Sequence, residues 1–105
     1  MDRRHKLALE YALSVIQEKY GEYINEAYLY GSCARGEENY DSDVDTLLFI
    51  KDSMPKEKRL MIGADTCPDD FTLPDIDIHI YLGSLEEKED NCFFTNIKTE
   101  GQRLI

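Results

Sequence analysis

The stretch Tyr30-Gly-Ser-Cys-Ala-Arg-Gly-Glu-Glu-Asn-Tyr-Asp-Ser-Asp-Val-Asp-Thr-Leu-Leu-Phe-Ile50 decides the fold of this chain. An apolar run, residues 27–30, leads into it, and a second apolar run, residues 46–50, ends it. Between the two runs stand Gly31-Ser32 and, after ten intervening residues, Asp43-Val44-Asp45. This order predicts a strand, a turn with a short helix, and a second strand that continues to about residue 51.

The residues at the two ends of the predicted turn suggest a chemistry. Asp43 and Asp45 are two residues apart, so on an extended backbone their side chains point to the same face. Two carboxylates there repel each other unless a cation lies between them, and Mg²⁺ is a hard cation that binds both carboxylates and phosphates. Gly31 and Ser32 end the preceding strand, where backbone N–H groups and a small hydroxyl can meet a phosphate. A phosphate-binding turn and metal-binding carboxylates are together the groups that nucleotidyl transfer requires.

The Gly-Ser pair, ten residues and Asp-x-Asp resemble the signature of the DNA polymerase β-like nucleotidyltransferase superfamily. Within it, the whole chain is similar to the minimal nucleotidyltransferases, which are stand-alone catalytic domains often encoded beside a HEPN-domain partner. Residues 96–105 are similar to the last helix and terminal strand of that family, so the resemblance runs from end to end. Many family members carry a second arginine where this chain has Cys33, so that contact is missing here.

We expect an α/β fold, with a small mixed sheet, helices packed mainly on one face and an open catalytic face on the other. Residues 5–20 predict an amphipathic helix that Gly21 ends, because apolar side chains recur at spacings of four and three. A second helix is expected after Pro55. His5 and its basic neighbours, Arg3, Arg4 and Lys6, are interpreted as a solvated N-terminus.

A third strand, about residues 74–82, supplies a further acid. Its isoleucines, at 76, 78 and 80, alternate with Asp75, Asp77 and His79, so the polar groups share one face. Asp77, with apolar neighbours on both sides, best matches the third acid of the family. Asp75 is the fallback, and a structural or solvated role is favoured for His79.

A capping box at Ser84–Glu87 predicts the start of the last helix, which should run to about Thr99 before Gly101 breaks it. Ser84 would accept a hydrogen bond from the backbone of Glu87, whose side chain would reach back to it.

The length and net charge of the chain limit the functions that it can have. The chain has 105 residues, enough for one domain, and we expect residues 1–105 to form a single nucleotidyltransferase domain. The net charge of −10 argues against bulk binding to nucleic acid. No apolar run is long enough for a membrane span and no signal peptide opens the chain, so a cytoplasmic location is expected. Three widely spaced cysteines form neither a zinc pattern nor a disulfide framework.

The resemblance implies a metal-dependent enzyme that moves AMP from ATP to an acceptor hydroxyl. Asp43, Asp45 and Asp77 would bind two Mg²⁺ ions, and Gly31 and Ser32 would hold the phosphates. Arg35 would touch phosphate, although a structural pairing with Glu37, Glu38 or Asp41 is slightly favoured.

The acceptor implied by the family is a HEPN-type ribonuclease toxin, modified on a tyrosine, with this chain as the antitoxin. Two alternatives stay open. One is transfer to a small molecule such as an aminoglycoside by a homodimer, and the other is a non-catalytic module that binds an NTP or a partner.

Overall fold

The computed structural model describes all residues from 1 to 105, and its helices and strands alternate along the chain. The elements are α1 (Arg3–Tyr20), a 3₁₀ turn (Gly21–Tyr23), β1 (Ile24–Tyr30), α2 (Gly31–Arg35), β2 (Val44–Ile50), α3 (Lys56–Thr66), β3 (Ile76–Leu82), α4 (Cys92–Glu100) and β4 (Gln102–Arg103). The order β1, α2, β2 confirms the predicted sequence of a strand, a short helix and a second strand. No helix has both the length and the apolar character that crossing a membrane requires.

The strands form one mixed sheet in the order β3-β2-β1-β4. β1 runs antiparallel to both β2 and β4, whereas β2 and β3 are parallel and are joined through α3. A parallel pair needs such a crossover, because the chain must return to the same end of the sheet. The mixed sheet and the α/β class are therefore as predicted.

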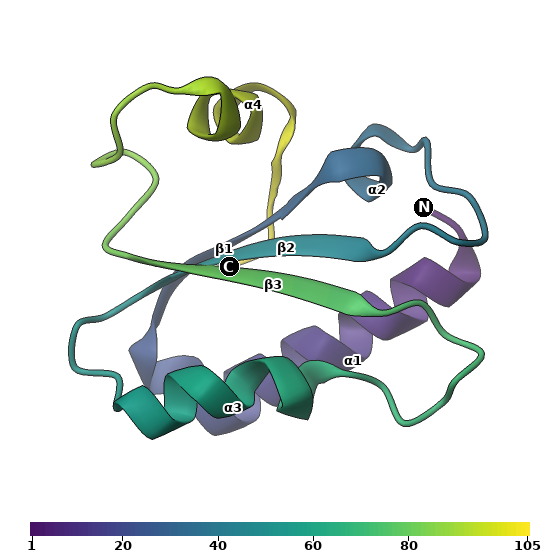
Figure 1. Cartoon of the computed structure of the whole chain (residues 1–105), viewed down its shortest axis with the longest axis horizontal. Coiled ribbons are helices and arrows are strands. Elements are labelled where there is room, and N and C mark those ends of the chain that lie inside the picture. The colour runs from purple at the N-terminus through teal and green to yellow at the C-terminus, as the bar shows by residue number, and fades with distance from the viewer.

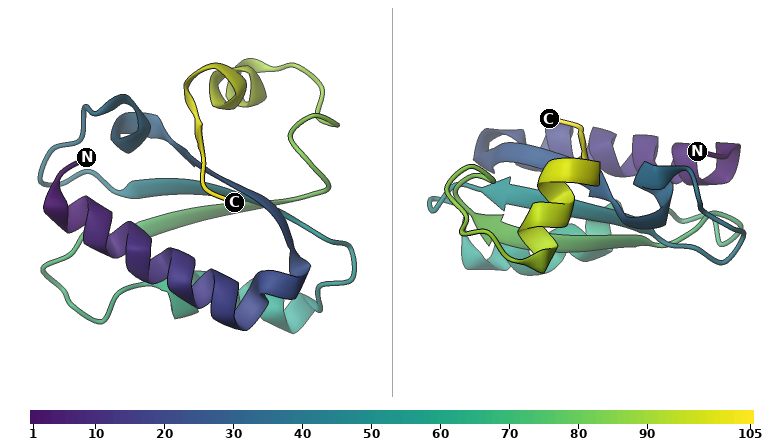
Figure 2. Two further views of the ribbon diagram at one scale, coloured as in Figure 1. Left: turned by 180° about the vertical axis from the view of Figure 1, so that it is seen from behind. Right: turned by 90° about the horizontal axis from the view of Figure 1, so that it is seen from above.

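The sheet forms the middle layer of the molecule (Figure 1). α1 and α3 lie side by side along one face, and α4 stands over the opposite face beside the short α2 (Figures 1 and 2). Two helices thus cover one face along its length, and α4 covers only part of the other. The prediction of an open face is therefore met only in part, because α4 covers the Leu47 and Phe49 side of the sheet and leaves the end at Asp45 uncovered.

Side-chain alternation explains how the layers pack. Val44, Leu48 and Ile50 of β2 point toward α1 and α3, where they join two buried clusters. Leu47 and Phe49 point the other way and pack with Phe94 and Ile97 of α4 in a third cluster, which also includes Tyr28 and Leu85. Burying an aliphatic or aromatic side chain of this size contributes roughly 1.5–3 kcal/mol. β2 is buried on both faces for this reason, and only its N-terminal end, at Asp45, is left for solvent.

The predicted start of the last helix is wrong. Ser84 and Glu87 lie in an irregular segment, and the helix begins at Cys92 with Asn91 as its N-cap. The side-chain oxygen of Asn91 accepts from the backbone N–H of Phe94 at 2.8 Å. Tertiary contacts override the local capping box, because Leu85 is buried and its N–H donates to the Glu26 carboxylate at 2.9 Å.

Candidate active site

The parallel pairing of β2 and β3 brings two of the predicted acids together. Asp45 is the register partner of Asp77 on one side and of Tyr30 on the other. All three side chains point to the face that α4 leaves partly open, because residues paired across a sheet share one face. The sheet thus places the Asp45 carboxylate between a phenol and a second carboxylate.

The charges around Asp45 are unbalanced. Partial burial, followed by the charges of Asp77 and Asp43, raises the pKa of the Asp45 carboxyl above its ordinary value, while His79 opposes the shift. The one basic side chain in contact with these acids is His79, whose Nε2 lies 3.5 Å from Asp77 Oδ2. A set of carboxylates with so little positive charge nearby is suited to a cation from solution.

Tyr30 completes this part of the site and was not recognised from the sequence. Burial, followed by the charges of Asp45 and Asp77, raises the pKa of its phenol, which therefore keeps its proton at neutral pH. Its ring lies 6.2 Å from the His79 ring and 5.4 Å, edge to face, from the Phe93 ring. An aromatic wall of Tyr30, His79 and Phe93 therefore borders the acids. The alternation of the strands could have shown Tyr30 and His79, but not Phe93 of α4.

Asp43 lies just before β2 and is exposed. Its backbone carbonyl accepts from the Cys33 thiol at 3.5 Å, and burial raises the pKa of that thiol to about 11. Its carboxylate acts on Asp45 through charge rather than contact. No three side chains of aspartate, glutamate, histidine or cysteine lie close enough together to hold a metal ion without moving. Asp45 and Asp77 are thus the paired acids, with Asp43 at their edge.

Asp75, the fallback for the third acid, is exposed and precedes β3. Its backbone carbonyl accepts from the Val44 N–H at 2.9 Å. Asp77, by contrast, lies within β3 as the register partner of Asp45. The geometry therefore supports Asp77 over Asp75.

Gly31 is required where β1 turns into α2. Its φ of +73° lies in the left-handed region, and a Cβ at this position would collide with Asp45 Oδ2. The backbone of the Gly31–Ser32 turn therefore approaches the carboxylate more closely than any other residue would allow. No side chain caps α2, and the Ser32 hydroxyl makes no hydrogen bond within the chain. The first N–H groups of α2 and this hydroxyl are free to meet a ligand.

Arg35 lies at the end of α2 and is held by acids. Its guanidinium contacts Glu37 at 3.1 Å and Glu100 of α4 at 3.6 Å. The structural pairing favoured from the sequence is present with Glu37, whereas Glu100 was not anticipated. Arg35 remains partly exposed, so it can also be reached from solution.

A groove of about 170 Å³ lies between α2 and α4, next to the Gly31–Ser32 turn. Its walls include the aromatic rings of Tyr30 and Phe93, and its polar groups come from Arg35, Glu100 and Asn96. Asn96 is exposed and its side-chain amide makes no hydrogen bond within the chain. An amide offers both a donor and an acceptor, so the groove combines apolar walls with a free hydrogen-bonding group.

The interpretation of His5 as part of a solvated N-terminus is wrong. Its side chain is fully buried, with Nε2 2.7 Å from the Ser42 carbonyl and Nδ1 2.7 Å from Asp2 Oδ1. Charge pattern alone gave no sign of this, because the loop that covers His5 comes from residues more than thirty positions away.

Comparison with known proteins agrees with this geometry. The family model described as "Polymerase beta, Nucleotidyltransferase" matches residues 13–105, so the chain belongs to this nucleotidyltransferase family. A crystal structure from Sulfolobus solfataricus, provisionally assigned as a nucleotidyltransferase, has a similar fold with a TM-score of 0.58 at 17% sequence identity. The match covers 95% of this chain and 81% of that chain, and at this identity it shows the fold alone. Comparison with curated proteins gives no significant match.

Proposed function

We propose that this protein is a metal-dependent nucleotidyltransferase that moves AMP from ATP to the hydroxyl of an acceptor protein. The observation that carries the proposal is the carboxylate pair of Asp45 and Asp77, in direct register and beside a glycine turn that fits closely against Asp45. Family membership supports the reaction class.

Asp43, Asp45 and Asp77 are the ligands we assign to two Mg²⁺ ions. The residues fit this ion, because they are hard oxygen donors and because partial burial, followed by the charges of Asp77 and Asp43, raises the pKa of Asp45. When bound, the ions would polarise the transferred phosphoryl group and lower the pKa of the attacking hydroxyl.

The Gly31–Ser32 turn would hold the β- and γ-phosphates through its backbone N–H groups and the Ser32 hydroxyl. The close approach at Gly31 brings these groups next to Asp45, so phosphates and acids face the same small volume. Arg35, at the far end of α2, would add one positive charge if it released one of its two acidic partners.

The groove between α2 and α4 is where we place the nucleoside. It borders the same Gly31 that faces Asp45, and the rings of Tyr30 and Phe93 give it apolar walls against which a base can pack. The free amide of Asn96 would hydrogen-bond the edge of the base. ATP is proposed as the donor from the resemblance to the family.

In the transfer step, the acceptor oxygen attacks the α-phosphorus and forms a new P–O bond. The bond to the β-phosphate breaks, and pyrophosphate leaves along the Gly31–Ser32 turn. Asp77 would take the proton of the hydroxyl, because its side chain is half exposed and can be reached by a bulky acceptor.

The acceptor we propose is a tyrosine of a HEPN-type partner protein, with this chain as the antitoxin. The resemblance to the minimal nucleotidyltransferases suggests the partner, and the net charge of −10 favours a basic one such as an RNA-binding ribonuclease. A homodimer that modifies a small molecule is the second candidate.

The test is to incubate the protein with Mg²⁺, α-labelled ATP and a HEPN-type protein from the same organism, followed by mass spectrometry. We expect AMP on a partner tyrosine, one pyrophosphate released per transfer, and no transfer by Asp45→Asn. Asp41→Asn is the matched control, because Asp41 is an exposed acid of the preceding loop that takes no part in the proposed site. An unmodified partner, together with efficient labelling of a small molecule, would favour the homodimer instead.

A further inference from the structure

The first turn of α1 contacts both of the loops that lead to the candidate acids. One loop, residues 36–43, ends at Asp43, and the other, residues 67–75, leads into β3 and Asp77. The N-terminus lies beside the first of these loops (Figures 1 and 2), where the Asp2 N–H donates to the Glu38 carboxylate at 2.7 Å. These contacts come from the segment that charge pattern alone suggested to be solvated.

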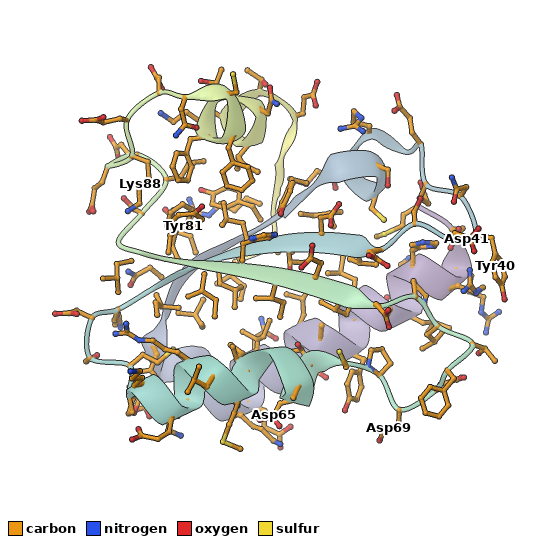
Figure 3. All side chains as sticks on the ribbon, in the orientation of Figure 1. Tyr40, Asp41, Asp65, Asp69, Tyr81 and Lys88 are labelled. Carbon is orange, nitrogen blue, oxygen red and sulfur yellow. The ribbon has the colours of Figure 1, made fainter.

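Arg4 joins the two loops through one side chain. Its Nε donates to the Thr72 carbonyl at 2.8 Å, and its Nη1 donates to the Tyr40 carbonyl at 3.3 Å. The guanidinium carbon also lies 4.0 Å from the centre of the Tyr40 ring, and Figure 3 shows Tyr40 and Asp41 beside the start of α1. The planar guanidinium offers several donors in a fixed fork, so it bridges two carbonyl groups with a more defined geometry than the flexible ammonium of a lysine.

His5 fixes the end of the first loop. Its fully buried ring contacts the carbonyl of Ser42, the residue directly before Asp43, at 2.7 Å. Its other ring nitrogen contacts Asp2 Oδ1 at 2.7 Å, and the same oxygen accepts the His5 N–H at 2.9 Å as the N-cap of α1. The backbone next to Asp43 is therefore attached to a capped helix end rather than to solvent.

The position of Asp43 depends on these contacts more than the positions of the other acids do. Asp45 and Asp77 lie within paired strands, whereas Asp43 is exposed and lies outside β2. Nearby, the Val44 N–H donates to the Asp75 carbonyl at 2.9 Å, so the two loops converge at the start of the β2–β3 pair. Loops held at this point would keep a fixed distance between Asp43 and the Asp45–Asp77 pair.

We propose that Arg4 and His5 are positioning residues of the metal site, which fix the backbone at Asp43 relative to the Asp45–Asp77 pair. This inference rests on the proposed function, because it takes Asp43 as a metal ligand. Groups that orient metal ligands without touching the metal change the affinity about 10- to 100-fold when they are removed.

The test compares Arg4→Met with Arg3→Met. Arg3 lies in the same turn and carries the same charge, but it is exposed and forms no hydrogen bond or ion pair. Mn²⁺ affinity is measured by calorimetry on each folded protein, with urea unfolding as a separate readout. We expect Arg4→Met to bind Mn²⁺ about tenfold more weakly, Arg4→Lys to recover part of the loss, and Arg3→Met to match the wild type. His5→Gln, which keeps one donor toward Ser42, should also weaken Mn²⁺ binding.

The outcomes separate this proposal from the proposed function. If Asp45→Asn loses Mn²⁺ binding while Arg4→Met and His5→Gln bind as the wild type does, the positioning role is wrong and the metal site stands. If Arg3→Met and Arg4→Met lose Mn²⁺ affinity equally, the loss comes from the change in net charge, and this too would overturn the positioning role. A wild type that binds no Mn²⁺ would overturn both.

Discussion

Asp45 and Asp77 face each other directly across the parallel pair of β2 and β3, and Nε2 of His79 lies 3.5 Å from Asp77 Oδ2. Two carboxylates in this register are costly to keep in a partly buried place unless a cation joins them. The rest of the sheet is well packed, so the fold can tolerate the cost of these two neighbouring carboxylates at one end. Functional sites are commonly found where a stable fold tolerates such a cost.

Replacing Asp45 with asparagine should therefore stabilise the metal-free protein at pH 7, because it removes a charge that is partly buried and repelled by Asp77 and Asp43. The gain should be at most about 1 kcal/mol, since solvent screens part of this cost. The pKa of Asp45 is raised in the folded state, so ionisation opposes folding above that raised pKa. The penalty disappears as the pH falls below the ordinary value of 3.8. Urea unfolding at pH 7 and pH 4 should show the variant more stable at pH 7, with a smaller difference at pH 4. A difference in stability that does not depend on pH would contradict the raised pKa of Asp45.

Gly31→Ala should damage both folding and metal binding. The residue has a φ of +73°, and an added Cβ would displace the Asp45 carboxylate. Gly36→Ala is a matched control, because Gly36 has a φ of +70° with open space around the added Cβ. Both variants should lose about 1–2 kcal/mol of stability from the left-handed backbone, and only Gly31→Ala should also lose Mn²⁺ affinity. If the two variants bind Mn²⁺ equally well, the close approach to Asp45 has no role in the site.

Asp77→Asn should abolish transfer of AMP, and Asp75→Asn should leave most of it. Asp77 is the register partner of Asp45, whereas Asp75 lies before the strand. Turnover with labelled ATP distinguishes the two, with circular dichroism to confirm that both variants are folded. An inactive Asp75→Asn beside an active Asp77→Asn would show that the third ligand is Asp75.

Asn96→Ala should raise the KM for ATP several-fold and change kcat little, because the proposed contact is to the base and not to the reacting phosphate. Thr95→Ala is a nearby control on α4, since Thr95 is exposed and does not line the groove. The comparison uses initial rates of pyrophosphate release at several ATP concentrations. An unchanged KM for ATP would show that the nucleoside does not bind in this groove.

The face that carries the acids could be predicted from the sequence because alternation along a strand is a local property. The two-residue spacings of Asp43 with Asp45 and of Ile76 with Ile78 were enough to separate an acidic face from an apolar one. The resemblance to the family suggested that Asp77 joins Asp45, but their direct register could not be predicted, because spacing within a strand does not give the register between strands.

The sequence-based predictions were wrong where segments far apart in the sequence contact each other. The capping box at Ser84 was overridden because Leu85 is buried against α4 and its N–H is bound by Glu26 of β1. His5 was expected in solvent, yet the loop that ends at Asp43 covers it. In both places a contact between residues far apart in the sequence outweighed a local preference.

The most direct test of the central claim is a calorimetric titration of Mn²⁺, in the presence of a non-hydrolysable ATP analogue, into the wild type, Asp45→Asn and Asp41→Asn. The analogue is included because the proposed site binds metal and triphosphate together. If the acids form a metal–nucleotide site, the wild type and Asp41→Asn will bind Mn²⁺ alike and Asp45→Asn will lose at least about tenfold in affinity. Equal affinity in all three proteins would contradict the assignment of Asp45 as a metal ligand and the function proposed from it.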